Sequence, residues 1–279
     1  MNKKIGVIGT GRLGGMLIRG LTGRGAVPPG LMYIFNRSPH KSLQFKELMP
    51  EINLAANARA VVAEADLIFL CVKPQDLPAL LAETGAAFPA GKMIVSTLLT
   101  PSLAELDRIL TGKIVRIYPS VTQSTGYGVT LMVCGKQVAT AEKQELQALL
   151  ECLGQTYEVP EACFRLYGDV TSCGPAFMAF MVGSLADAAV RHGGDAKLAA
   201  AMAEETMLGT AKLLQERSIT FRQLVEEVAT PGGCTAEGIN VLRAGLSDLL
   251  DGVFQATAVQ EEKLRQNIAA VLEKNQNRS

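Results

Sequence analysis

The sequence predicts an α/β chain in which a doubly wound, mostly parallel sheet is followed by an all-α domain. In the first 163 residues, short runs rich in Ile, Val and Leu alternate with helical segments. This alternation is typical of parallel strands covered by helices on both faces. A glycine-rich turn follows the first run. From residue 164 onward no convincing strand appears, so we place a domain boundary between residues 163 and 164.

The chain of 279 residues is long enough for two domains, and its composition excludes several classes of function. Lys and Arg together number 27, as do Asp and Glu, so the formal net charge is zero. The chain therefore has no strong electrostatic field that would attract nucleic acid or an anionic membrane. Gly6 and Gly9 interrupt the N-terminal apolar run, which is not a signal peptide, and we expect no membrane span. The six cysteines form no CxxC pair and indicate a reducing cytoplasm. His40 and His192 are too few for a histidine-rich metal site or a Ser-His-Asp triad, so we expect no metal.

The elements of the first half follow from these apolar runs and the segments between them. The predicted strands span residues 3–9, 31–35, 66–72, 92–98, 113–118 and 129–134. The predicted helices span residues 11–25, 57–65, 75–84, 101–110 and 139–153.

The glycine-rich turn is Gly9-Thr10-Gly11-Arg12-Leu13-Gly14, between the first strand and the first helix. In this setting Gly9 permits a tight turn, Gly11 allows close approach of a pyrophosphate, and Gly14 allows the helix to pack on the strand. The helix N-terminus then presents free N–H groups to the phosphates. The alternative is a glycine-rich turn without a ligand. We predict a Rossmann-type dinucleotide-binding domain over residues 1–163.

The end of the second strand distinguishes between the two nicotinamide cofactors. NAD sites usually carry Asp or Glu there, whereas this chain has Asn36-Arg37-Ser38, with Lys41 nearby. A guanidinium can pair with a 2′-phosphate, so we expect NADPH in preference to NADH, unless Arg37 is only a solvated loop charge. Lys73 and Pro74, at the end of the strand 66–72, are further candidates for the wall of the cofactor cleft.

Residues 164–279 are expected to form a helical domain rich in small and apolar residues. A helix over 170–194 ends at Gly193-Gly194, Asp195 can cap the next helix, and Thr220 and Gln223 form a possible capping box. One domain of this size cannot easily bury so much apolar surface, so we expect an obligate dimer at least.

The stretch VATPGGCTAEG, residues 228–238, interrupts these helices. Thr230-Pro231 ends one helix, Gly232 and Gly233 permit unusual backbone angles, and Thr235 is expected at the cap of the next helix. Such a turn is either a plain loop or a nest of N–H groups for a carboxylate. The second interpretation indicates a dehydrogenase acting on a small acid.

These motifs together resemble the pyrroline-5-carboxylate reductase family over nearly the full chain. The matching stretches are IGVIGTGRLGGML, NRSPHK, CVKPQD, SCGPAF with ADAAV, and ATPGGCTAEGINVL. The resemblance implies NAD(P)H-dependent reduction of Δ1-pyrroline-5-carboxylate to L-proline, by a Rossmann domain joined to a helical domain for dimerisation and substrate binding. Carried over, the substrate-binding residues are Thr230, Gly232, Gly233, Cys234 and Thr235, with Thr235 near the ring nitrogen as the catalytic residue. Carried over, the cofactor-binding residues are Gly9, Thr10, Gly11, Arg12, Leu13, Asn36, Arg37, Ser38, Val72, Lys73, Pro74 and Ser120.

The chain departs from the family where Tyr118-Pro119-Ser120 replaces the common Met-Pro-Asn. Cys173 and Cys234 are milder departures, which we interpret as small packing residues without an adjacent base. A divergent branch, resembling the reductase-like protein of bacterial late-competence operons, shares the serine. Three hypotheses therefore stay open: a proline-forming imine reductase, a reductase of another small imine or carbonyl acid, and a non-catalytic nucleotide-binding relative. A protonated imine is already electrophilic, so the absence of a candidate catalytic histidine agrees with imine reduction.

Overall fold

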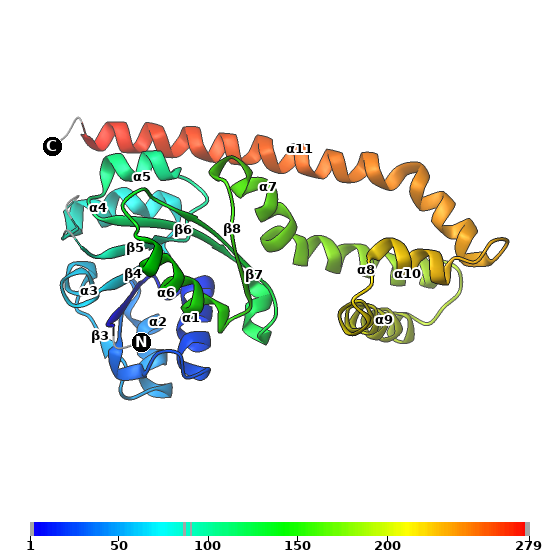
Figure 1. Cartoon of the computed structure of the whole chain (residues 1–279), viewed down its shortest axis with the longest axis horizontal. Coiled ribbons are helices and arrows are strands. Elements are labelled where there is room, and N and C mark those ends of the chain that lie inside the picture. The colour runs from blue at the N-terminus through cyan, green and yellow to red at the C-terminus, as the bar shows by residue number, and fades with distance from the viewer. Residues whose placement is uncertain (1–2, 86–87, 90, 277–279) are drawn as a thin grey trace. The chain divides into compact units, whose positions relative to one another are not determined.

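The computed structural model describes residues 3–85, 88–89 and 91–276, and most of its helices and strands are labelled in Figure 1. The chain divides into two compact units. The first, which we call the sheet unit, comprises Met1–Cys173 and Ala258–Ser279. The second, the helical unit, comprises Gly174–Thr257. This division follows packing rather than function, so the predicted domain boundary after residue 163 stays a prediction.

The sheet unit contains an eight-stranded sheet in the order β3-β2-β1-β4-β5-β6-β7-β8. All neighbouring strands are parallel except β6 and β7, which confirms the predicted doubly wound, mostly parallel sheet. Its strands are β1 (Ile5–Ile8), β2 (Met32–Phe35), β3 (Asn53–Leu54), β4 (Leu67–Leu70), β5 (Met93–Ser96), β6 (Lys113–Pro119), β7 (Val129–Cys134) and β8 (Gln155–Glu158).

Two of these strands were not predicted, and both lie at the edges of the sheet. β3 is two residues long, and in β8 only Thr156 is buried. An edge strand with little buried surface needs no apolar run, so periodicity does not reveal it. Helix α2 was missed for a similar reason, because only Ser42 and Phe45 of its residues are buried.

Helices cover both faces of the sheet, and two large clusters of buried side chains, with a smaller third one of Leu131, Val133 and Phe164, form the core. One cluster joins the sheet to α1, α2 and α6 through residues such as Leu17, Phe45 and Leu150. The other joins it to α3, α4 and α5 through residues such as Val61, Leu80 and Leu106. The helices of this unit are α1 (Arg12–Gly23), α2 (Pro39–Leu48), α3 (Ala58–Glu64), α4 (Leu77–Thr84), α5 (Leu103–Ile109), α6 (Thr140–Glu151) and α7 (Phe164–Gly168).

The helical unit contains α8 (Gly174–Arg191), α9 (Ala196–Arg217), α10 (Phe221–Val228) and the first part of α11 (Cys234–Gln276). From residue 164 the described chain contains no strand, as predicted. The predicted caps are also confirmed. The Asp195 side chain accepts a hydrogen bond from the Leu198 N–H at 2.8 Å, and Thr220 and Gln223 cap α10 reciprocally.

The predicted helix over 170–194 is confirmed from its start to Arg191, although it opens with a π-helical turn. Residues Asp169–Cys173 form this π-helical turn, and α8 begins at Gly174.

The expectation that no segment could span a membrane needs correction. By length and composition alone, the helical stretch Glu161–Arg191 is apolar enough to cross one, with a mean hydropathy of 1.5. Within the chain, α8 buries only Gly174 and Ala186.

Candidate functional site

A cleft of about 320 Å³ opens at the carboxyl ends of β1, β2 and β4 in the sheet unit. Strand order reverses here, because the chain builds β2 and β3 on one side of β1 and β4 on the other. Such a switch point is where open α/β sheets bind ligands. The cleft is lined by Ile8, Gly9, Gly11, Phe35, Asn36, Arg37, Ser38, Lys41, Cys71, Val72, Lys73, Gln75, Asp76, Ala79, Leu80 and Glu83.

The glycine-rich turn has the local geometry that its sequence predicts. Gly9 has φ +99°, and its N–H donates to the Phe35 carbonyl at 2.8 Å. A Cβ at Gly14 would lie 1.9 Å from the Gly9 carbonyl oxygen, so only glycine lets α1 start this close to β1. A Cβ at Gly11 would meet nothing within 4 Å, so the backbone before α1 faces open space. The first N–H groups of α1 can therefore receive an anion.

Asn36 ties the loop after β1 to the loop after β2. Its side-chain oxygen accepts from the Thr10 N–H at 3.0 Å, and its amide nitrogen donates to the Ser38 carbonyl at 3.1 Å. The Thr10 hydroxyl is buried and has no hydrogen-bond partner among the described residues. A buried hydroxyl without a partner costs free energy, which a polar ligand can recover. The turn and this hydroxyl both fit a bound dinucleotide.

Arg37 reaches across the cleft to Asp76. Its guanidinium lies 2.8 Å from the Asp76 carboxylate, while 80% of the arginine side chain stays exposed. Ser38 is the N-cap of α2, but its side chain makes no capping hydrogen bond. Lys41 adds a second cation to the same wall. The sequence analysis missed Asp76, although its place three residues after Lys73 put an acid near this end of the cleft.

The cleft collects some of the predicted cofactor residues and leaves others outside its lining. Those that line it are Gly9, Gly11, Asn36, Arg37, Ser38, Val72 and Lys73. Thr10, Arg12, Leu13, Pro74 and Ser120 are not among its lining residues.

Ser120 is buried, and its hydroxyl is committed to its own loop. It lies 2.9 Å from the Thr122 hydroxyl and caps the short helical turn Val121–Thr125. The Ser120 N–H donates to the Gln123 side chain at 3.2 Å. Its side chain therefore performs a structural task, whatever else it contacts.

Tyr118 and Cys173, two of the departures from the resembled family, contact each other. Their side chains lie close together, and burial raises the pKa of both groups. The centroid of the tyrosine ring also lies 5.7 Å from that of the Phe164 ring. Cys173 therefore packs as expected, beside a tyrosine that lies far from it in the sequence. A thiol with a raised pKa is a poor nucleophile, so a cysteine-based mechanism stays disfavoured.

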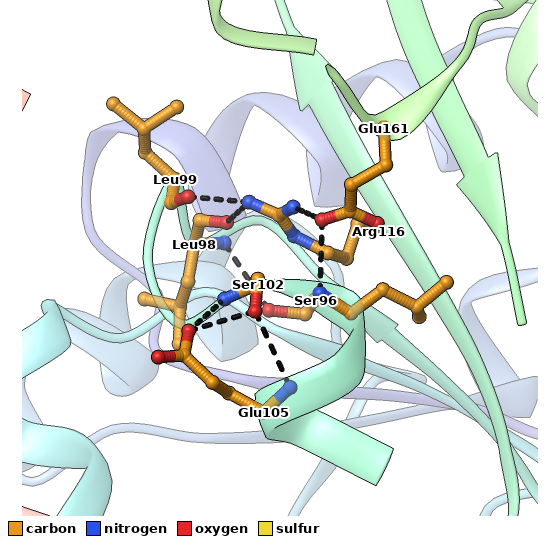
Figure 2. A network of polar contacts seen from close by, with 8 residues as sticks. Ser96, Leu98, Leu99, Ser102, Glu105, Arg116 and Glu161 are labelled. Atoms are coloured by element: carbon orange, nitrogen blue, oxygen red, sulfur yellow. Dashed lines mark hydrogen bonds and ion pairs between the residues drawn. The ribbon is translucent and has the colours of Figure 1, made fainter. Parts of the chain in front are cut away.

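A buried polar network fixes the loops that follow β5 (Figure 2). The Arg116 guanidinium forms an ion pair with Glu161 and donates to the carbonyls of Leu98, at 3.3 Å, and Leu99. Glu161 also accepts from the Leu103 N–H at 2.9 Å. Burial lowers the pKa of Arg116, and the charge of Glu161 opposes that shift. These contacts pair both terminal guanidinium nitrogens of Arg116, whereas its buried Nε has no hydrogen-bond partner among the described residues, and we assign the network to the architecture of this edge.

The loop 230–235 lies in the helical unit. Gly232 has φ +76°, and the Gly233 N–H donates to the Thr230 carbonyl at 2.9 Å. The expectation that Thr235 caps the next helix is wrong. The Gly233 carbonyl already accepts from the Ala236 N–H at 3.1 Å, so α11 begins at Cys234 and Thr235 is its second residue. Cys234 is exposed in the described chain rather than packed.

A broad apolar groove of about 930 Å³ runs along α8 and α9 of the helical unit. We call the exposed side chains that line it or flank it on these two helices the apolar face. It includes Met178, Phe180, Leu185, Leu198, Met202 and Met207. No residue of α9 is buried in the described chain, which is unusual for a helix of 22 residues. Exposed apolar surface of this extent marks an interface.

Comparison with known proteins gives matches over both halves of the chain. Residues 4–100 match the family model described as NADP oxidoreductase coenzyme F420-dependent, and residues 161–264 match pyrroline-5-carboxylate reductase dimerisation. ComE operon protein 4 of Bacillus subtilis (strain 168) is 32% identical over 261 residues, covering 93% of this chain and 96% of that protein. Pyrroline-5-carboxylate reductase of Escherichia coli (strain K12) is 30% identical over 244 residues, covering 87% and 90%.

Among solved structures, Plasmodium falciparum pyrroline carboxylate reductase with NADP bound shares the fold. Its TM-score is 0.78 at 20% identity, and the alignment covers 98% of this chain and 97% of that one. The likeness therefore extends through the sheet and the helices that follow it.

Proposed function

The chain belongs to the pyrroline-5-carboxylate reductase family of NAD(P)-dependent oxidoreductases, and on that premise we propose that it reduces Δ1-pyrroline-5-carboxylate to L-proline. The observation that carries the proposal is the loop 230–235, where a glycine at φ +76° turns the chain into the start of α11. N–H groups at a helix start favour an anion such as the substrate carboxylate.

We propose NADPH as the cofactor, with NADH as the alternative. When bound, its reduced nicotinamide ring supplies the hydride. The turn Gly9–Gly14, with Thr10, Arg12 and Leu13, would hold the pyrophosphate, and Val72, Lys73 and Pro74 would line the neighbouring wall. Arg37 and Ser38, positioned beside Asn36, would meet the adenosine ribose and its 2′-phosphate. The paired cations Arg37 and Lys41 support a cofactor that carries an extra phosphate.

We propose that the protein anchors the substrate and excludes water from it. Thr230, Gly232, Gly233 and Cys234 would surround the carboxylate, and the Thr235 hydroxyl would hydrogen-bond the ring nitrogen. A protonated imine is already electrophilic, so positioning rather than strong acid catalysis carries the rate.

We further propose that the chain acts in the cytoplasm as a homodimer or a higher homo-oligomer. The match of residues 161–264 to a dimerisation family supports self-association, and the apolar face offers the surface for it. The six cysteines are all free thiols, which supports a reducing compartment.

One observation favours a second candidate. Ser120 stands where the family commonly has Asn, and here it caps its own loop. The similarity to ComE operon protein 4 also favours this second candidate. The alternative is therefore a relative that reduces another small imine or carbonyl acid, or that binds a nucleotide without turnover.

Steady-state assays with matched variants test the proposal. Purified protein is given NADPH and pyrroline-5-carboxylate, and NADPH absorbance is followed. We expect Thr235→Ala to lower kcat/KM about 100-fold, the usual cost of losing one preorganised donor. Thr235→Ser keeps the hydroxyl and should stay within several-fold of the wild type. Equal activity of the two variants, or no substrate-dependent oxidation by the wild type, contradicts the proposal and favours the second candidate.

A further inference from the structure

We propose that Asp76 sets the cofactor preference of this chain by competing with the 2′-phosphate for Arg37. The inference rests on the proposed function, because it assumes that the cleft holds a nicotinamide dinucleotide. It assigns a role to a residue that the sequence analysis did not identify. NAD sites usually place a carboxylate at the end of the second strand, and here Asn36 occupies that place. Asp76 brings a carboxylate to the same cleft from the segment after β4.

The contact between the two residues is specific. The Arg37 guanidinium lies 2.8 Å from Asp76 Oδ1, and both residues line the cleft. The Asp76 N–H donates to the Lys73 carbonyl at 2.9 Å, so a short helical turn fixes the backbone that carries the acid. Arg37 is the more exposed partner, since 80% of its side chain is open to solvent compared with 29% for Asp76.

The other acid in the cleft has a different task. Glu83 accepts from the Ala58 N–H at 2.7 Å and so helps to cap α3. The cations that line the cleft are Arg37, Lys41 and Lys73, and Arg37 is the one that pairs with Asp76. Asp76 is therefore the carboxylate that balances Arg37, and it stands beside the cation that a 2′-phosphate needs.

The two cofactors meet this pair differently. A 2′-phosphate must draw Arg37 away from Asp76 and tolerate the repulsion of the carboxylate that is left. A ribose 2′-hydroxyl can instead donate to Asp76 while Arg37 keeps its partner. Exposed ion pairs are weak, so the competition is modest, and both cofactors should bind. Asp76 thus reduces the preference for NADPH over NADH that Arg37 and Lys41 create.

Calorimetric titration of NADPH and of NADH, without substrate, tests this role. We expect Asp76→Ala to tighten NADPH binding about three- to ten-fold and to weaken NADH binding, because the variant removes a competitor from one cofactor and an acceptor from the other. In the Arg37→Ala background, the gain for NADPH should shrink, because the competition for Arg37 is gone and only the repulsion between Asp76 and the phosphate is left to relieve. Asp107→Ala removes one exposed acid from α5, outside the cleft lining, and controls for net charge.

The outcomes separate this inference from the proposed function. If both cofactors shift in the same direction, if neither shifts, or if Asp107→Ala has the same effect, Asp76 does not set the preference. An NADPH gain of undiminished size in the Arg37→Ala background would also overturn the inference. If the wild type binds neither cofactor, the proposed function fails together with the inference. Because substrate is absent, a wrong substrate assignment leaves this result unaffected.

Discussion

The sheet unit and the helical unit both contain helices with apolar side chains. The sheet unit buries these side chains, whereas the helical unit leaves many of them exposed. In the sheet unit, α1 buries Leu17, Ile18 and Leu21 completely. In the helical unit, α9 buries none of its residues, and Leu185 of α8 is 67% exposed. The difference lies in the second layer. A sheet covers α1 within its own unit, whereas the apolar face has no such layer among the described residues of the helical unit.

This difference identifies the helical unit as the part of the chain that offers a surface for self-association. Burial of apolar surface stabilises both units, and a second copy of the chain can supply the layer that the helical unit lacks among its described residues. This explains why the stretch Glu161–Arg191 is apolar enough to pass for a membrane span. The match of residues 161–264 to a dimerisation family supports the same conclusion.

The largest effect is expected from a charge placed on the apolar face. Leu185→Asp should weaken self-association at least 100-fold, about 2.7 kcal/mol, because an unpaired carboxylate would have to enter an apolar interface. Sedimentation velocity measures the change. Leu48→Asp is the matched control, since Leu48 is 72% exposed on α2 of the sheet unit. If Leu185→Asp sediments as the wild type does, the apolar face is not the interface.

An intermediate effect is expected from removing one charge of an ion pair in each unit. Arg116 is 3% exposed, so Glu161→Gln leaves a buried guanidinium without its counter-charge. Because the Glu161 side chain is itself 35% exposed, the variant should lower the free energy of unfolding by about 2 kcal/mol, less than the cost of breaking a fully buried pair. Glu227→Gln breaks the exposed pair with Arg217 and should cost much less, because solvent screens both charges. Urea unfolding compares the two variants. Equal costs would mean that burial does not distinguish these pairs.

Local sequence signals predicted what local structure determines. The strand, the turn Gly9–Gly14 and the helix after it follow one another in the chain, so their geometry could be inferred from spacing alone. The Thr220–Gln223 box was found in the same way. Such motifs need only neighbouring residues, which the sequence displays directly.

The features that were missed depend on contacts between distant segments. Asp76 meets Arg37 across 39 positions, and Glu161 meets Arg116 across 45. Neither pairing leaves a periodic pattern in the sequence. The shift of Thr235 from the cap into α11 is different, because helix starts vary by a residue or two even when their signals are clear.

The smallest effect, and the sharpest test of the comparison, comes from two equivalent capping boxes. Ser102 and Glu105 cap α5 in the sheet unit, and Thr220 and Gln223 cap α10 in the helical unit. Ser102→Ala and Thr220→Ala should each cost about 1 kcal/mol, because each leaves a helix N–H without its partner.

The two costs should nevertheless appear in different transitions of a calorimetric scan. A unit completed by a second copy unfolds at a temperature that rises with protein concentration, whereas a self-contained unit does not. Ser102→Ala should therefore lower a concentration-independent Tm, and Thr220→Ala a concentration-dependent one. If both variants move a single transition, the two units unfold together. The apolar face would then stabilise the sheet unit as well, and the contrast between the units would be one of exposure only.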